Sequence, residues 1–159
     1  TWFIVPFYAL VMWQQHRKMF WHVFFVVALV VGVLTVPFVW WDARAFFESV
    51  VLYLTGNTTT SYPISGYGLG MLLNEFGFIR DIHAYYPFIY WQIVFAVPVL
   101  GVLSLWVWKK PSESKLIISY AVYLAVYWYM SRYFNNSHLG YLSMLFVLGG
   151  LKVIDEQST

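Results

Sequence analysis

The chain has 159 residues, of which 61% are hydrophobic and 23% aromatic but only 10% charged, and its formal net charge is +2. Because an ordinary soluble domain carries about 25% charged residues, this composition predicts an integral membrane protein. The small net charge and the scattered basic residues argue against nucleic acid as a partner. The absence of cysteine excludes disulfides and cysteine metal sites.

Long apolar runs predict an all-α, polytopic integral membrane helical bundle. The first run, residues 2–13, is shorter than the roughly 20 residues that a spanning helix needs, so we expect Thr1 to lie inside a truncated helix of a longer protein. A polar loop at 14–18 comes next. Residues 19–41 then form a full span that ends at a pair of tryptophans, as is typical of a membrane interface.

Residues 42–86 predict a long outer loop that contains short helices. In its first part, Phe46, Phe47 and Val50 share one helical face, which is typical of an amphipathic helix lying along the membrane surface. Asp42 is placed to cap the start of this helix.

Two further local patterns lie in residues 42–86, which we call the insertion. Arg44 and Glu48 are four residues apart on the polar face of the first helix and predict an intrahelical ion pair. A second short helix is expected near 69–76, where Gly77 would end it.

Three more apolar segments complete the bundle, at 87–108, 116–132 and 139–151. A basic turn at 109–115 joins the first two, and a polar tail follows the last. The final two runs are short for a membrane crossing. Where they meet, residues 131–138 carry a guanidinium, two carboxamides and an imidazole.

Basic residues in short loops favour the cytoplasmic side of a membrane. If each apolar segment crosses once, loops 14–18 and 109–115 and the C-terminus are cytoplasmic, whereas residues 42–86 and 133–138 are extracytoplasmic. The insertion and the polar turn, although remote in sequence, are then expected to meet on one face.

The polar turn is the first candidate site, with Arg132, Asn135, Asn136 and His138 as its residues. Ionisable groups at a membrane boundary are costly, and they commonly serve a function. A guanidinium can bind a phosphate bidentately, so these residues could hold a phosphate or pyrophosphate headgroup. In the alternative interpretation, Arg132 reaches toward lipid headgroups and the carboxamides bond to water.

The outer loop offers a second candidate site, made of Asp42, Asp81 and His83. Asp81 and His83 could act as an acid/base pair if they reach a cleft from an extended segment. Helix capping alone explains Asp42. No histidine and carboxylate spacing typical of metal ligands is present, so we expect no metal and no cofactor.

The order of these features resembles the C-terminal part of the GT-C class glycosyltransferases, polytopic enzymes that take a sugar from a polyprenyl-phosphate donor. The likeness is carried by residues 41–47 (WDARAFF), 61–68 (SYPISGYG) and 131–136 (SRYFNN). It implies that the catalytic carboxylate lies on an earlier external loop, in a missing N-terminal portion. It also implies that Arg132 balances the donor phosphate while Asn135, Asn136 and His138 orient phosphate or sugar.

A non-catalytic transmembrane subunit of a larger membrane complex is the alternative function. Partners expected from the two hypotheses are membrane lipids, a lipid-linked sugar donor, and the rest of the same polypeptide or partner membrane subunits. Small residues would permit close approach of helices in either case, at Gly101, Gly140, Gly149 and Gly150.

Overall fold

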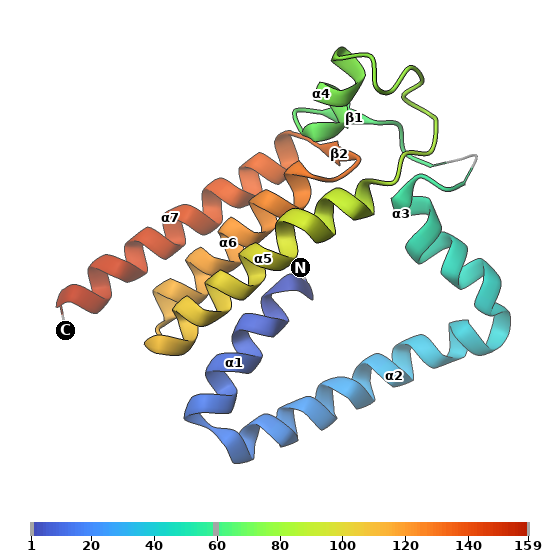
Figure 1. Cartoon of the computed structure of the whole chain (residues 1–159). Coiled ribbons are helices and arrows are strands. Elements are labelled where there is room, and N and C mark those ends of the chain that lie inside the picture. Colours follow the sequence, from blue (N-terminus) through green and yellow to red (C-terminus); the bar gives the residue numbers. More distant parts are fainter. Residues whose placement is uncertain (1, 59–60, 159) are drawn as a thin grey trace.

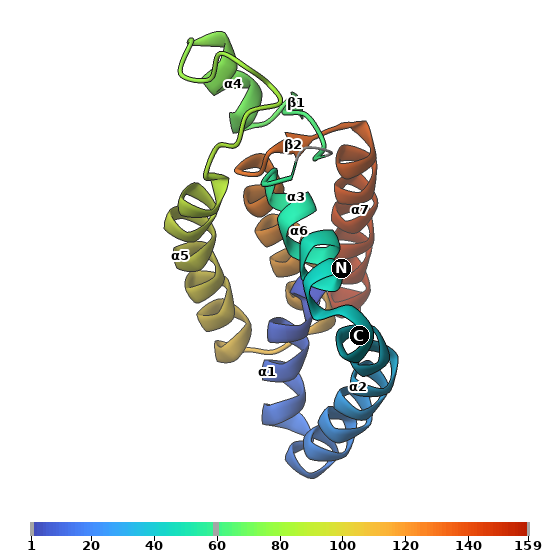
Figure 2. The same ribbon diagram turned by 90° about the vertical axis from the view of Figure 1, so that its right-hand side faces the viewer.

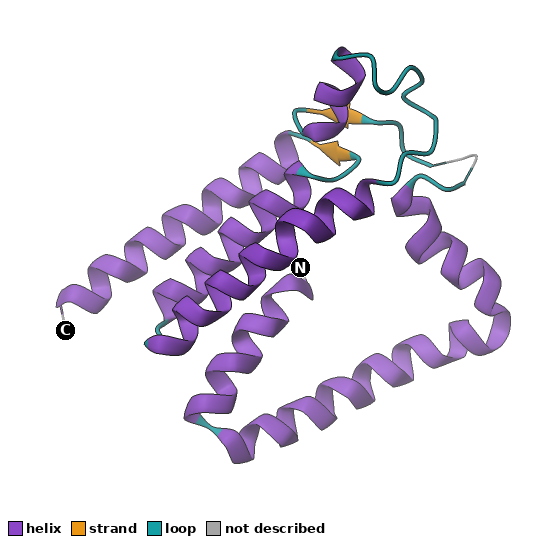
Figure 3. Cartoon of the chain, viewed as in Figure 1, coloured by secondary structure: helices purple, strands orange, loops and turns teal. Residues whose placement is uncertain are grey.

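The computed structural model of the chain describes residues 2–58 and 61–158, so Thr1, where a truncated helix is expected, lies outside the described part. The fold of the described residues is mostly helical, with one small pair of strands at one end (Figure 3). The elements in chain order are the 3₁₀ turn η1 (Trp2–Ile4), α1 (Val5–Gln15), α2 (Arg17–Phe47), the π-helical turn η2 (Glu48–Leu52), α3 (Tyr53–Thr55), β1 (Ser65–Gly66), α4 (Leu69–Glu75), α5 (Phe88–Lys109), α6 (Glu113–Tyr129), β2 (Tyr133–Phe134) and α7 (Asn136–Ser158).

Within the described residues, three helical segments are long and apolar enough to cross a membrane: Arg17–Leu52, α5 and α7. The expected all-α membrane architecture is confirmed at this level. The bounds of α5 agree with the predicted segment 87–108 to within a residue at each end.

Helix α6 forms the centre of the bundle and lies between α5 and α7 (Figures 1 and 2). Its spacing explains this position, because Tyr120, Ala121 and Leu124 share one side of the helix and are nearly or fully buried. They pack with Phe7 of α1 and Leu142 of α7 in a single apolar core. The expected segment 116–132 is thus an internal helix that starts three residues earlier and ends at Tyr129.

Helix α7 is longer than the sequence predicts. The expected segment 139–151 is part of a helix that runs from Asn136 to Ser158, and its 23 residues are enough for a membrane crossing. The polar tail is helical because it pairs with the start of α6. Lys152 Nζ lies 2.9 Å from Glu113 Oε2, and Glu156 accepts hydrogen bonds from the backbone N–H and the hydroxyl of Ser114 at 2.9 and 2.6 Å.

The expectation that four glycines allow close helix approach is correct only for Gly149. A β-carbon added there would lie 2.7 Å from Ile118 Cγ1, so α6 and α7 are close at this point. At Gly101, Gly140 and Gly150 an added β-carbon meets nothing within 4 Å, because these glycines do not face a neighbouring helix.

Helix α2 extends past the predicted end at residue 41. Asp42 breaks the regular geometry, with φ −152° and ψ 90°, and its carboxylate accepts a hydrogen bond from Ala45 N at 2.9 Å. The next segment therefore starts as a newly capped helix, as predicted. The predicted ion pair also forms, with Arg44 Nε 2.9 Å from Glu48 Oε1. Figure 1 shows α2 apart from the bundle, and α2 buries no residue.

The strands β1 and β2 were not expected in an all-α chain. They are parallel, with Ser65 opposite Tyr133 and Gly66 opposite Phe134. This pairing attaches the insertion to the turn between α6 and α7. Gly66 is required here, since it has φ 95° and a β-carbon would overlap the carbonyl of Phe134.

Candidate functional site

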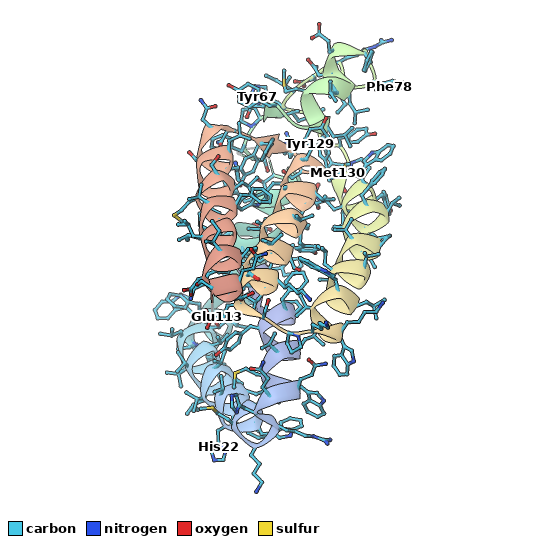
Figure 4. All side chains as sticks on the ribbon, turned by 90° about the vertical axis from the view of Figure 1, so that its left-hand side faces the viewer. His22, Tyr67, Phe78, Glu113, Tyr129 and Met130 are labelled. Atoms are coloured by element: carbon cyan, nitrogen blue, oxygen red, sulfur yellow. The ribbon has the colours of Figure 1, made fainter. Side chains whose placement is uncertain are left out.

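A cavity of about 560 Å³ opens at the end of the bundle where the insertion is attached. We call it the insertion-side cavity. Its walls come from η1, the end of α2, η2 and α3, the start of α5, the end of α6, the turn before α7 and the first turn of α7. Figure 2 shows α3 in front of α6 between α5 and α7, and Figure 4 shows Tyr129 and Met130 near this end of the bundle, opposite the end that carries Glu113.

The cavity combines apolar and polar walls. Phe47, Val51 and Ile89 contribute apolar surface, whereas polar groups come from four separate elements and include Asn57, Gln92, Arg132 and His138. A ligand that fills it would therefore need both an apolar and a polar part.

Arg132 is 3% exposed and its guanidinium is bound by main-chain carbonyls of the insertion. Nε donates to Tyr62 O, Nη1 donates to Ala84 O at 2.9 Å, and Nη2 donates to Ile82 O and His83 O at 3.1 and 3.3 Å. These contacts use four of the five N–H groups of an arginine. Arg132 thus ties two stretches of the insertion to the helical bundle, and it does not present the open fork expected for bidentate phosphate binding.

The charge of Arg132 is not neutralised by a carboxylate. Among the residues that the structure describes, none forms an ion pair with it. Burial lowers the pKa of the Arg132 guanidinium, and the charge of the nearby Asp81 acts in the opposite direction. Because arginine does not lose its proton in proteins, a net positive charge remains at the wall of the insertion-side cavity.

Asn135 and His138 form a tight local arrangement at the start of α7. Asn135 Oδ1 accepts from Ser137 N at 3.2 Å and His138 N at 3.4 Å, which is the geometry of a helix cap. The same oxygen lies 2.7 Å from His138 Nδ1. The imidazole stands edge-on to Trp128, with ring centroids 4.5 Å apart, and lines the cavity. Asn136 is exposed and does not line it.

The second candidate set is not gathered at the cavity. Asp42 lies at the break in α2, while Asp81 and His83 have exposed side chains. Asp81 Oδ1 accepts from His83 N at 2.8 Å, so these two residues shape a local turn. Their loop contributes main-chain carbonyls to Arg132, and none of the three side chains lines the cavity.

Sequence reasoning missed several polar residues of the cavity, among them Gln92 and Asn57. Gln92 is 9% exposed, and its Nε2 donates to Tyr127 O at 3.4 Å. A signal was present, since Gln92 is a lone carboxamide within an otherwise apolar span. Asn57 carried no such signal because it stands in a loop rich in polar residues.

In the part of the chain that the structure describes, no three histidine, aspartate or glutamate side chains are grouped so that they could hold a metal ion. Comparison with protein-family models, with curated proteins and with solved structures finds no match to this chain.

Proposed function

We propose that this chain is the C-terminal membrane portion of a glycosyltransferase that uses a lipid-phosphate-linked sugar donor, and that the insertion-side cavity binds this donor. One observation carries the proposal: a single cavity has apolar walls and borders a buried cation without a carboxylate partner. A polyprenyl-phosphate sugar has the matching parts, namely an apolar chain, an anion and a polar headgroup.

The apolar chain would lie against Phe47, Val51 and Ile89, all of which have surface open to the surroundings of the protein. The phosphate would lie toward Arg132. Since most N–H groups of Arg132 are held by carbonyls, this residue would act mainly through its charge, which is less screened at a 3% exposed position than at the surface. The amides of Asn57 and Gln92 would bond to the headgroup.

We assign no catalytic residue to this chain. The resemblance to GT-C enzymes implies a general base on an earlier external loop, which would deprotonate the acceptor hydroxyl. In this proposal residues 42–86 and 133–138 face the extracytoplasmic side, the helix that follows Asp42 lies along that membrane surface, and loops 14–18 and 109–115 face the cytoplasm.

The proposal is tested in membranes that contain the full-length protein and radiolabelled polyprenyl-phosphate sugars. Val51→Trp should fill part of the cavity and reduce formation of labelled product at least tenfold. Val50→Trp is the matched control, because Val50 is adjacent and exposed but does not line the cavity. Transfer that is unchanged by Val51→Trp, or equally reduced by both substitutions, would remove the assigned role of the cavity.

A non-catalytic subunit of a membrane complex is the second candidate, and the exposure of α2 favours it. No residue of α2 is buried, although its apolar residues extend around the whole helix. Because these 159 residues contain no cysteine, single cysteines at Phe25 and Val33 would be the only thiols in this part of the protein, and they can be cross-linked. A specific cross-link to one other polypeptide, together with no sugar transfer, would favour the subunit over the transferase.

A further inference from the structure

We infer that His138 accepts a hydrogen bond through Nε2 from a hydroxyl group of the bound headgroup, and that it thereby selects sugar-bearing lipids over the bare lipid phosphate. This inference rests on the proposed function of the insertion-side cavity, and it assigns His138 a role different from that of Arg132.

The first step is the identity of the Asn135 side-chain atom that meets His138. Two backbone N–H groups, of Ser137 and His138, point at Asn135 Oδ1 at 3.2 and 3.4 Å. Only an acceptor can satisfy both donors, so this atom is the carbonyl oxygen and not the amide nitrogen. The cap of α7 therefore fixes the orientation of the Asn135 carboxamide.

The second step assigns the proton of the imidazole. His138 Nδ1 lies 2.7 Å from Asn135 Oδ1, and two acceptors would repel each other at that distance. Nδ1 must therefore carry the proton and donate it to Asn135. Asn135 N also lies 3.2 Å from Nδ1, a contact that would suit an unprotonated Nδ1. We assign the proton to Nδ1 because the contact with Asn135 Oδ1 is 0.5 Å shorter. In the neutral imidazole, Nε2 then has a free lone pair.

The third step is the position of the ring. His138 is held between aromatic neighbours, with ring centroids 4.5 Å from Trp128 and 5.5 Å from Tyr133, and it lines the cavity. Among the residues that the structure describes, none makes a hydrogen bond to its Nε2. The structure thus leaves one oriented acceptor for a ligand.

The chemistry of this acceptor favours a hydroxyl over an ionised phosphate oxygen. An ionised phosphate oxygen at Nε2 of the neutral imidazole would meet a lone pair instead of a donor, whereas a hydroxyl can donate to it. Two residues of the cavity wall would then bind different parts of the lipid: the positive charge of Arg132 attracts the phosphate, and His138 accepts a hydrogen bond from a hydroxyl of the sugar.

Two substitutions separate the ligand contact from the helix cap. In His138→Gln the terminal amide can place an oxygen near the position of Nε2, so an acceptor is kept. In His138→Asn the shorter amide can still donate to Asn135, but no acceptor remains at the position of Nε2.

The experiment measures binding of three lipids to the full-length protein in nanodiscs by native mass spectrometry: polyprenyl phosphate, polyprenyl-phosphate-mannose and polyprenyl-phosphate-glucose. His138→Asn should weaken binding of at least one sugar-bearing lipid about three- to tenfold and leave polyprenyl phosphate within about twofold, as expected for one lost hydrogen bond. His138→Gln should recover part of the difference. Equal weakening for all three lipids, or no change for any, overturns the inference.

A readout without ligand tests the tautomer itself. Nitrogen NMR of isotope-labelled histidine should show His138 protonated at Nδ1 in wild type and in Asn135→Asp, which keeps the acceptor, and should show a mixture in Asn135→Ala. Protonation at Nε2 in wild type overturns the inference even if every lipid binds. If the Nδ1 tautomer is found but none of the three lipids binds to wild type, both the proposed function and this inference fail.

Discussion

Gly56 packs directly against the guanidinium of Arg132, so closely that a β-carbon on Gly56 would overlap Nη1. Gly56 also has φ 85°, a conformation that other residues adopt only at a cost. The glycine thus ends α3 and makes room for the cation that holds the insertion.

Replacement of Gly56 by alanine should displace Arg132 and loosen the loop at residues 82–84. Gly77→Ala is the matched control, since Gly77 has φ 77° but nothing within 4 Å of its added β-carbon. Both variants should lose about 1 to 2 kcal/mol from backbone strain, and Gly56→Ala should lose more. Hydrogen exchange of the 82–84 amides measures the difference; equal exchange in both variants would contradict the packing.

Arg132→Lys should also release the insertion, because an ammonium cannot reach four carbonyls arranged around a planar guanidinium. We expect a loss of about 2 to 4 kcal/mol in local stability, given about 1.5 to 3 kcal/mol for a hydrogen bond to a charged group and partial replacement by water. Limited proteolysis between residues 76 and 87 measures it. Arg80→Lys, at an exposed position, should leave the digestion pattern unchanged.

Glu156→Ala should weaken the junction between the end of α7 and the start of α6. The carboxylate accepts from both the backbone N–H and the hydroxyl of Ser114, a 3% exposed residue. Its removal leaves the buried N–H unpaired, whereas the hydroxyl still contacts Ser112 Oγ at 3.0 Å. Thermal unfolding in detergent should report a loss of about 1 to 2 kcal/mol. Glu113→Gln breaks only the exposed pair with Lys152 and should cost about 0 to 1 kcal/mol. A larger loss for Glu113→Gln would reverse this ranking.

Gly149→Leu should force α6 and α7 apart, because even a β-carbon at this position lies 2.7 Å from Ile118 Cγ1. Overpacking of this kind costs about 1 to 3 kcal/mol. Gly150→Leu adds the same side chain one residue later, where nothing lies within 4 Å, and should leave the unfolding temperature nearly unchanged. Equal stability of the two variants would show that the helices are not in contact at Gly149.

Local patterns predicted much of the fold. The long apolar runs indicated two of the three helical segments that could cross a membrane, Arg17–Leu52 and α5, whereas α7 was predicted too short. The short-range pattern at Asp42, Arg44 and Glu48 predicted a cap and an ion pair that the structure contains. These features depend on residues a few positions apart, so one sequence is enough to identify them.

Features that depend on distant segments were not predictable in the same way. The helical end of α7 requires Ser114, which lies 42 residues before Glu156. The hydrogen bonds from Arg132 to main-chain carbonyls could not be predicted. Every residue has a carbonyl, and the sequence does not tell which of them will lie near the guanidinium. Convergence of the insertion and the turn at 133–138 was expected, and the pairing of Ser65 with Tyr133 confirms it.

The bonds of Arg132 also bear on the order in which the molecule can be completed during synthesis. Ala84 and Tyr62 leave the ribosome 48 and 70 residues ahead of Arg132, whose guanidinium will donate to their carbonyls. Until that arginine emerges, those carbonyls lack the donor that they have in the folded protein. The insertion-side cavity can therefore take its final form only after the turn between α6 and α7 has been translated.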